Sequence, residues 1–171
     1  MRNIVQPAGR AYNACAVREY VYRVDAEGRV FHDGSEIVDP PTLRFFLLAL
    51  QRTPEGRWLA LCQGERNWFE ADDTPFVVQR LGLESAGGVL SRVELRLAGD
   101  YREPLDPATL THDGARLYCR VRKGLFRARF GRVALQQIAP HVLEDGGSPV
   151  LALAGRRYPL TAGSATSRPS A

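Results

Sequence analysis

Short strand-like runs separated by tight turns fill most of this chain, and they limit the folds that it can adopt. Turn signals recur at Asp33-Gly34, Gln63-Gly64, Gly87-Gly88, Lys123-Gly124 and Ala154-Gly155. Turns of this length join antiparallel neighbours, whereas parallel strands need a long crossover. The sequence therefore predicts an α+β fold with predominantly antiparallel sheets, packed by two helices, and not a parallel doubly wound sheet.

Two segments carry the helical signals. Asp39 suits an N-cap, and Pro40 and Pro41 fit the first turn, where their missing N–H groups would have no intrahelical partner. This helix is predicted to end at residues 53–56. A second helix is predicted over residues 131–143, and Pro140 should kink or end it.

Both tryptophans lie in the segment 56–80, which is predicted to form a meander of three strands. Leu59–Cys62 is almost continuously apolar, as in a buried strand, and residues 67–70 return after the Gln63-Gly64 turn. Asp72-Asp73-Thr74-Pro75 is a strong turn signal that leads into a third strand over residues 76–78.

The length of 171 residues fits a single domain. We predict one α+β domain over residues 18–160, either as a single unit or divided into two lobes at 18–98 and 115–160. Residues 1–17 are predicted to be a poorly ordered N-terminal segment, and residues 161–171 a disordered tail rich in Ser, Ala and Gly. No run approaches the ~20 apolar residues of a membrane span.

The basic residues are almost all arginine. The formal net charge is +4, and Lys123 is the single lysine among 23 basic residues. Arginine favours bidentate phosphate and carboxylate contacts, although coding bias in a chain rich in Ala, Gly and Pro is the simpler explanation. Cys15, Cys62 and Cys119 are far apart and indicate neither a disulfide framework nor a zinc site, which suits a reducing, cytoplasmic location.

The first candidate site is a ligand-binding site around an arginine at a turn. Glu65, Arg66 and Asn67 follow the Gln63-Gly64 turn, and Arg66 could pair with Asp33 or Asp73 at the end of the sheet. An arginine flanked by an amide and by the carboxylates of Asp33, Asp72 and Asp73 is common in phosphate or carboxylate sites. The alternative is a structural ion pair and turn cap.

The second candidate is a basic hairpin over residues 116–132. Its strands and turn carry Arg120, Arg122, Lys123, Arg127 and Arg129, with aromatic residues interleaved, so that one face could bind RNA or DNA through phosphate contacts and stacking. In the alternative interpretation the hairpin is half buried, with its aromatic residues in the core and a solvated basic face.

Other chemistries find little support in the residue spacing. His32, His112 and His141 follow no metal-binding or catalytic-triad spacing, and no cofactor-binding signature or metal site is predicted. Cys62 as a nucleophile would need a base, and His32 is the nearest nominee. Asp33, Asp72 or Asp73 would be the acid or base if the protein were an enzyme acting on an anionic substrate.

Three motifs resemble an uncharacterised protein family with bacterial members and small animal members expected in mitochondria. They are Tyr20-x-Tyr22, Asp25-x-x-Gly28-x-x-Phe31-x-Asp33 and Cys62-x-Gly64-Glu65-Arg66-Asn67. The later segments 121–126 and 157–160 are similar to a second bacterial α+β family of unknown function. The two resemblances span residues 18–160 and imply a fold and an order of elements, but no activity; a eukaryotic source would imply a mitochondrial location.

Three function classes follow from these observations. The preferred one is a non-enzymatic binding or adaptor domain for a protein partner or a small anionic ligand. The alternatives are an accessory protein that binds nucleic acid through the basic hairpin, and an enzyme on an anionic substrate.

Overall fold

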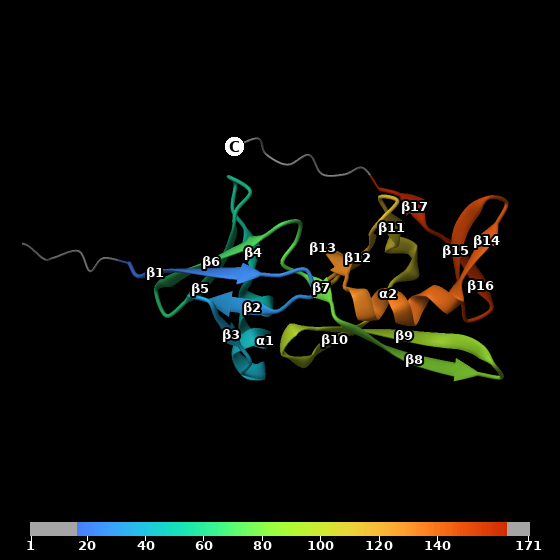
Figure 1. Ribbon diagram of the computed structural model, residues 1–171, viewed down its shortest axis with the longest axis horizontal. Helices are drawn as coiled ribbons and strands as arrows, with labels where there is room; N and C mark the ends of the chain where they lie inside the picture. The colour runs from blue at the N-terminus through green and yellow to red at the C-terminus, as the bar shows by residue number, and fades with distance from the viewer. Residues whose placement is uncertain (1–16, 164–171) are drawn as a thin grey trace, which may run out of the picture.

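Six short strands form the first sheet, at one end of an elongated molecule (Figure 1). The computed structural model describes residues 17–163, so residues 1–16 of the predicted N-terminal segment and residues 164–171 of the predicted tail lie outside the described residues. The spatial order is β3-β2-β1-β6-β5-β4. The strands are β1 (Glu19–Val24), β2 (Val30–His32), β3 (Ser35–Ile37), β4 (Gln51–Arg52), β5 (Trp58–Cys62) and β6 (Glu65–Ala71).

The pairing in this sheet is antiparallel except at its centre, where β1 and β6 run parallel. The predicted turns are confirmed, since Asp33 and Gly34 take φ values of 47° and 80°, and Gln63 and Gly64 take 49° and 83°. The chain between β1 and β6 includes a helix, which provides the crossover that a parallel pair requires. The predicted α+β class is confirmed.

The helix α1 (Pro40–Ala49) covers one face of this sheet. Its N-cap is Asp39 as predicted, and the Thr42 N–H donates to the Asp39 carboxylate at 2.9 Å. The Phe46 ring lies 4.9 Å from the Tyr22 ring and 5.2 Å from the Phe69 ring. Because side chains alternate along a strand, Val21 and Trp68 belong to the opposite, open face.

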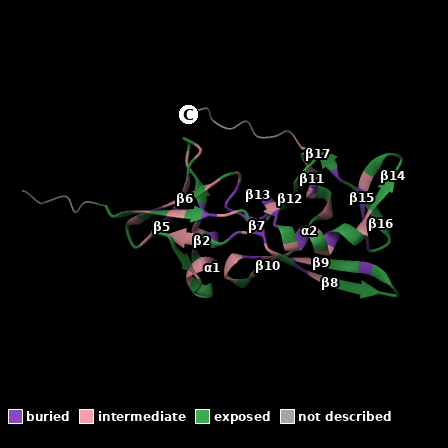
Figure 2. Ribbon diagram, in the orientation of Figure 1, coloured by how far each residue is buried: buried purple, intermediate pink, exposed green. Residues whose placement is uncertain are grey.

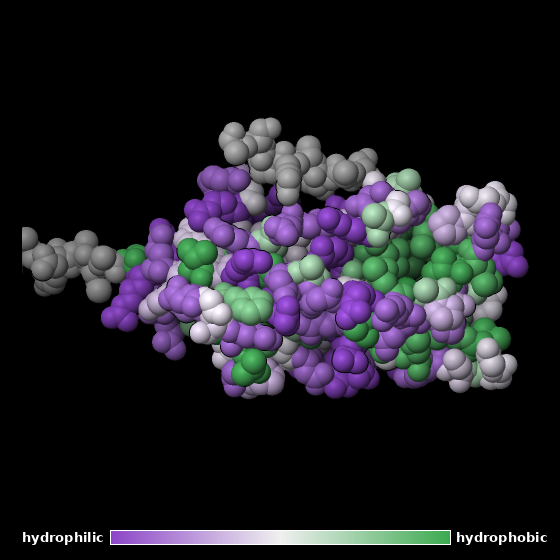
Figure 3. Space-filling view, viewed as in Figure 1, coloured by the Kyte–Doolittle hydropathy of each residue, from purple (hydrophilic) through white to green (hydrophobic). Residues whose placement is uncertain are grey.

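The remainder of the chain builds three further sheets around a second helix, α2 (Arg132–Ile138). Figure 3 shows hydrophobic side chains gathered over the half of the molecule that contains α2 and β15. The strands are β7 (Val77–Val78), β8 (Arg80–Ala86), β9 (Val89–Leu97), β10 (Tyr101–Pro104), β11 (Thr111–His112), β12 (Leu117–Val121), β13 (Phe126–Phe130), β14 (Val142–Asp145), β15 (Ser148–Leu153), β16 (Arg156–Pro159) and β17 (Thr161–Ala162). They pair as β10-β9-β8, β17-β11-β12-β13-β7 and β14-β15-β16.

The short strand β7 joins the two halves of the molecule. It pairs parallel with β13, in a sheet that contains neither β5 nor β6, so the predicted three-stranded meander is wrong for its third strand. Thr74 Oγ1 donates to the Arg127 carbonyl at 2.8 Å, and the Gly131 N–H donates to the Val78 carbonyl at 2.9 Å. These bonds redirect the chain out of the first sheet.

One hydrophobic core runs through both halves (Figure 2). Phe46 and Phe69 of the first half belong to the same cluster as Val121, Ala128 and Leu151 of the second half. The chain leaves the first sheet at residues 72–76, and β8 and β9 pack with the later elements. The division into two lobes stays a prediction.

The structure also adds short elements that the sequence pattern does not show. Thr161 and Ala162, the first two residues of the predicted tail, form β17 beside β11. The helix predicted to end at residue 143 stops at Ile138; Ala139–His141 form a 3-10 turn around Pro140, and β14 follows. Across residues 17–163 no helix is long and apolar enough to cross a membrane.

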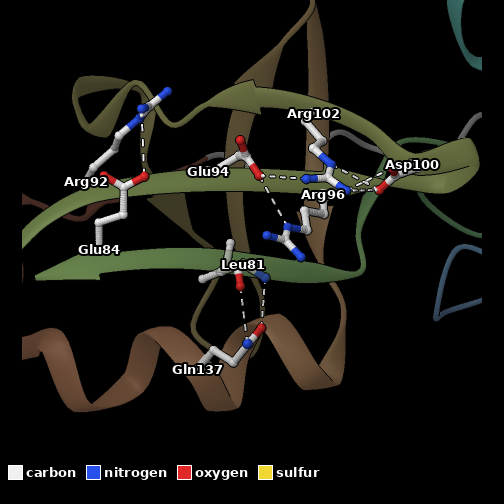
Figure 4. A network of polar contacts seen from close by, with 8 residues as sticks. All are labelled: Leu81, Glu84, Arg92, Glu94, Arg96, Asp100, Arg102 and Gln137. Atoms are coloured by element: carbon white, nitrogen blue, oxygen red, sulfur yellow. Dashed lines mark hydrogen bonds and ion pairs between the residues drawn. The ribbon is translucent and has the colours of Figure 1, made fainter.

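Paired charges lie along the exposed surface of the β10-β9-β8 sheet and the turn before β10 (Figure 4). Arg92 lies 3.7 Å from Glu84, Arg96 lies 3.2 Å from Glu94, and Arg102 lies 2.8 Å from Asp100. On the edge of β8 that faces away from β9, the Gln137 amide of α2 accepts from the Leu81 N–H at 2.8 Å and donates to the Leu81 carbonyl at 3.3 Å.

Gly99 generates the first prediction, because its left-handed backbone packs directly against α1. A Cβ atom there would clash with the Arg44 backbone nitrogen and lie 2.7 Å from the Pro40 carbonyl oxygen, at a φ of 68°. We expect Gly99→Ala to lower the free energy of unfolding by about 3–5 kcal/mol, from overpacking and backbone strain together. Urea denaturation monitored by circular dichroism measures this loss.

Gly155→Ala is the matched control. Gly155 has a φ of 71°, but no heavy atom lies within 4 Å of a Cβ placed there. Gly155→Ala should lower the free energy of unfolding only by the ~1–2 kcal/mol that a left-handed backbone conformation costs a residue with a Cβ atom. Equal losses in both variants would contradict the packing explanation.

Candidate functional site

The predicted arginine site at the start of β6 is held by ion pairs of its own. Arg66 Nη1 lies 3.1 Å from Glu19 Oε1, so Arg66 pairs with Glu19 and not with Asp33 or Asp73. Glu65 faces Arg18 at 3.8 Å. Asn67 is buried, and its amide donates to the Ala60 carbonyl at 3.2 Å. These contacts match the structural alternative considered for this turn.

The carboxylates predicted to join Arg66 lie elsewhere. Asp33 is exposed on the turn between β2 and β3, where its carboxylate lies 3.4 Å from His32 Nε2. Asp72 and Asp73 follow the far end of β6, roughly 20 Å from Arg66 at the rise of an extended strand. The structure therefore does not assemble the predicted set into one site.

A cleft of about 580 Å³ instead brings Asp72 and Asp73 to the basic hairpin. It lies between the β5 and β6 end of the first sheet and the β12–β13 hairpin. Its lining combines four arginines, three carboxylates and several aromatic rings: Arg52, Gly56, Arg57, Trp58, Trp68, Phe69, Glu70, Ala71, Asp72, Asp73, Thr74, Arg120, Leu125, Phe126 and Arg127. The cleft thus unites parts of both predicted candidate sites.

Two arginines lie directly opposite each other on the hairpin wall of the cleft. Arg120 of β12 is registered against Arg127 of β13, so their side chains share one face. The Arg127 guanidinium carbon lies 3.4 Å from the centroid of the Tyr118 ring, which fixes its position. Within residues 17–163, the exposed Arg120 side chain makes no ion pair, hydrogen bond or ring contact.

Two other arginines of the hairpin hold the fold together. Arg122 Nη1 donates to the carbonyls of Leu47 at 3.2 Å and Leu50 at 2.7 Å, at the C-terminal end of α1. Arg129 Nη2 donates to the Ala26 carbonyl at 2.6 Å in the turn between β1 and β2. Lys123 is exposed at the tip of the hairpin. The predicted basic stripe is therefore divided between structural and surface positions.

Tyr118 links the hairpin to the carboxylates beneath it. Its hydroxyl oxygen lies 2.8 Å from Asp73 Oδ2 and 3.1 Å from Asp113 Oδ2, and Arg116 Nη1 lies 3.7 Å from Asp73. Burial, followed by the hydrogen bond to Asp73, raises the pKa of Tyr118. Asp73 is therefore held in place by a hydroxyl and a guanidinium.

Aromatic rings form the opposite side of the cleft. Trp58 packs at 5.6 Å from Phe76 and 5.7 Å from Phe126, so this wall is continuous with the core. The Arg57 guanidinium carbon lies 3.7 Å from the centroid of the Trp68 ring. Arg57 is exposed and extends the flat surface of Trp68 outwards.

The described residues show neither a cluster of metal ligands nor an exposed thiol with a lowered pKa at Cys119. Within residues 17–163, no three His, Cys, Asp or Glu side chains converge as metal ligands would. Cys119 is buried, and burial followed by the nearby Glu103 raises the pKa of its thiol.

Sequence reasoning did not single out Arg52, Arg57, Trp58, Trp68 and Phe126 as cleft residues. Strand parity places Trp58 and Trp68 on opposite faces of the first sheet, and nothing local indicates that both border one hollow at its end. The Arg120–Arg127 pair was accessible from the sequence, because a turn at residues 122–125 fixes the register of the hairpin.

Comparison with known proteins shows the fold. No protein-family model matches this chain. The structure is similar to that of a DUF1285 family protein from Silicibacter pomeroyi, with a TM-score of 0.61 and 19% identity over 85% of this chain and 83% of that one. It is also similar to a DUF1285 family protein from Shewanella baltica, with a TM-score of 0.53 and 13% identity over 71% of this chain and 91% of that one.

These similarities confirm, at the level of fold, the expected likeness to bacterial proteins of unknown function. The resemblance to mitochondrial animal proteins and to a second bacterial family stays a prediction.

The different environments of Arg122 and Arg120 generate a stability prediction. Arg122→Gln removes two charge-assisted hydrogen bonds to carbonyls at the end of α1 and should lower the free energy of unfolding by about 2–3 kcal/mol. Arg120→Gln should change it by less than about 0.5 kcal/mol. Urea denaturation of both variants checks this, and equal effects would contradict the assignment.

The Tyr118 hydroxyl generates a prediction about alkaline pH. Its pKa is raised above the ordinary 10.0, so the native state keeps a proton that the unfolded chain loses. The stability that this contributes is complete below pH 10 and falls as the pH rises through the native pKa. Tyr118→Phe should cost about 1–2 kcal/mol at pH 7 and lose less stability than wild type between pH 9 and 10.5. Identical pH slopes in urea denaturation would show that Tyr118 is not the responsible group.

Proposed function

We propose that this protein is a non-enzymatic binding domain that holds a small anionic ligand in the cleft between the first sheet and the β12–β13 hairpin. The observation that carries the proposal is the cross-strand pair Arg120–Arg127 on the cleft wall. Like charges directly opposite each other destabilise a strand pair. An anion bound between the two guanidinium groups would offset that repulsion.

The surroundings of the pair support the same conclusion. Guanidinium groups bind phosphate and carboxylate through parallel hydrogen bonds, and stacking on Tyr118 holds Arg127 in one orientation. Asp73 is engaged by Tyr118 and Arg116, so it does not neutralise Arg120. The volume of about 580 Å³ falls within the range of small-molecule sites.

Nucleic-acid binding through the hairpin is the second candidate, and the exposed Arg120 and Lys123 support it. Arg122 and Arg129, however, are committed to carbonyls of other elements. The carboxylates of Glu70 and Asp72 along the same cleft would repel a continuous phosphate chain. These features make a small ligand the better match, in a protein that we place in the cytoplasm.

Isothermal titration calorimetry with pyrophosphate and citrate, at low and high salt, tests the proposal. Binding to the wild-type protein should weaken as salt rises. Arg120→Gln should lose at least about tenfold in affinity, since one charge-assisted bidentate contact contributes about 1.5–3 kcal/mol.

Arg92→Gln is the matched control, because Arg92 is an exposed strand arginine with a single, distant ion pair to Glu84. It should bind as the wild type does. Equal binding by Arg120→Gln and the wild type would contradict the proposal, as would no binding of either anion.

A further inference from the structure

Resting on the proposed function, we infer that the anionic ligand is a mononucleotide, with one phosphate, a ribose and a planar base. The arginine pair accounts only for the phosphate. The remaining lining of the cleft shows two further features, a stacking surface and unpaired carboxylates, and a mononucleotide matches both.

The stacking surface consists of Trp68 and the guanidinium group of Arg57. The guanidinium carbon lies 3.7 Å from the ring centroid, so a flat cation covers a flat ring beside the cleft. Arg57 is exposed, and its outer face has no ring contact within residues 17–163. Bases stack on arginine planes and on aromatic rings alike. A ligand with only a phosphate or a carboxylate would leave this surface unused.

The carboxylates require hydrogen-bond donors on the ligand. Glu70 and Asp72 line the cleft and are exposed, and within the described residues their side chains have no ion pair or hydrogen bond. An ionised carboxylate only accepts hydrogen bonds. Ribose hydroxyls and the amino groups of bases donate them, whereas inorganic phosphate and simple dicarboxylates at neutral pH present mainly acceptors.

The balance of charge limits the number of phosphates. Four arginines and three carboxylates line the cleft, which leaves a small positive excess. One phosphate bound at the Arg120–Arg127 pair would neutralise this excess positive charge. A second or third phosphate, or the backbone of a long strand, would extend negative charge towards Glu70 and Asp72.

Tryptophan fluorescence provides a local readout, since the two tryptophans of the chain both line the cleft. The wild-type protein would be titrated with AMP, ribose 5-phosphate, adenosine and a 5′-phosphorylated tetranucleotide. AMP should quench the fluorescence and bind at least about tenfold more tightly than ribose 5-phosphate, because stacking contributes ~1–3 kcal/mol per base. AMP should also bind at least about tenfold more tightly than adenosine, which lacks the phosphate for the Arg120–Arg127 pair.

Two variants separate the contributions of base and phosphate. Trp68→Leu should weaken AMP about tenfold and leave ribose 5-phosphate, followed by calorimetry, unchanged. Arg120→Gln should weaken both ligands to a similar extent, and Arg92→Gln should affect neither. Circular dichroism melting of each variant shows whether it is folded.

The possible results distinguish the two levels of the proposal. Equal affinities for AMP and ribose 5-phosphate would overturn the mononucleotide and leave the anion-binding function standing. No binding of any phosphorylated ligand would overturn both. Tighter binding of the tetranucleotide than of AMP would assign the cleft to the end of a nucleic-acid strand, against the charge argument given above.

Discussion

The parallel pairing of β7 with β13 is the contact on which the rest of the structure depends. Only two residues of β7 take part, yet Thr74, Phe76 and Val78 all bond to the backbone of residues 127–131, at 2.8–2.9 Å. Thr74 is only 6% exposed, and its hydroxyl also accepts from the Phe76 N–H at 3.3 Å, so both hydrogen bonds of this buried group hold the junction together. This junction fixes β13 against the end of β6 and thereby sets the distance between Asp72 and the hairpin arginines.

Arginine serves three purposes in this protein, and composition alone cannot separate them. Arg122 and Arg129 bind backbone carbonyls of distant elements and act as structural cross-links. Arg57 and Arg127 lie over aromatic rings, which limits the freedom of their guanidinium groups. Arg120 has neither kind of contact in the described residues. Some arginines therefore stabilise the fold and others line the candidate site, although the sequence alone does not distinguish them.

The sequence predicted correctly those turns and the helix cap that depend only on residues close together in the chain. Asp33-Gly34 and Gln63-Gly64 turn as expected, and Asp39 caps α1, because each depends only on neighbouring residues. The parallel pairs β1–β6 and β7–β13 were missed, since they depend on contacts that turn signals do not encode. The same reason explains Arg66, whose partner Glu19 lies on a strand 47 residues away. The cleft itself is formed by three separate segments, so the sequence indicated only some of its charged members, Asp72, Asp73, Arg120 and Arg127, and not their arrangement.

The contact between Gln137 and Leu81 has a consequence for how the protein meets copies of itself. An open sheet edge presents N–H and C=O groups that can recruit a strand from another molecule and begin aggregation. The carbonyl oxygen of the Gln137 amide accepts from the Leu81 N–H, and its NH2 group donates to the Leu81 carbonyl. A single side chain therefore stands in for an additional strand at the inner part of β8. Glu84 adds a charge further along the same edge, which opposes the addition of a second chain there.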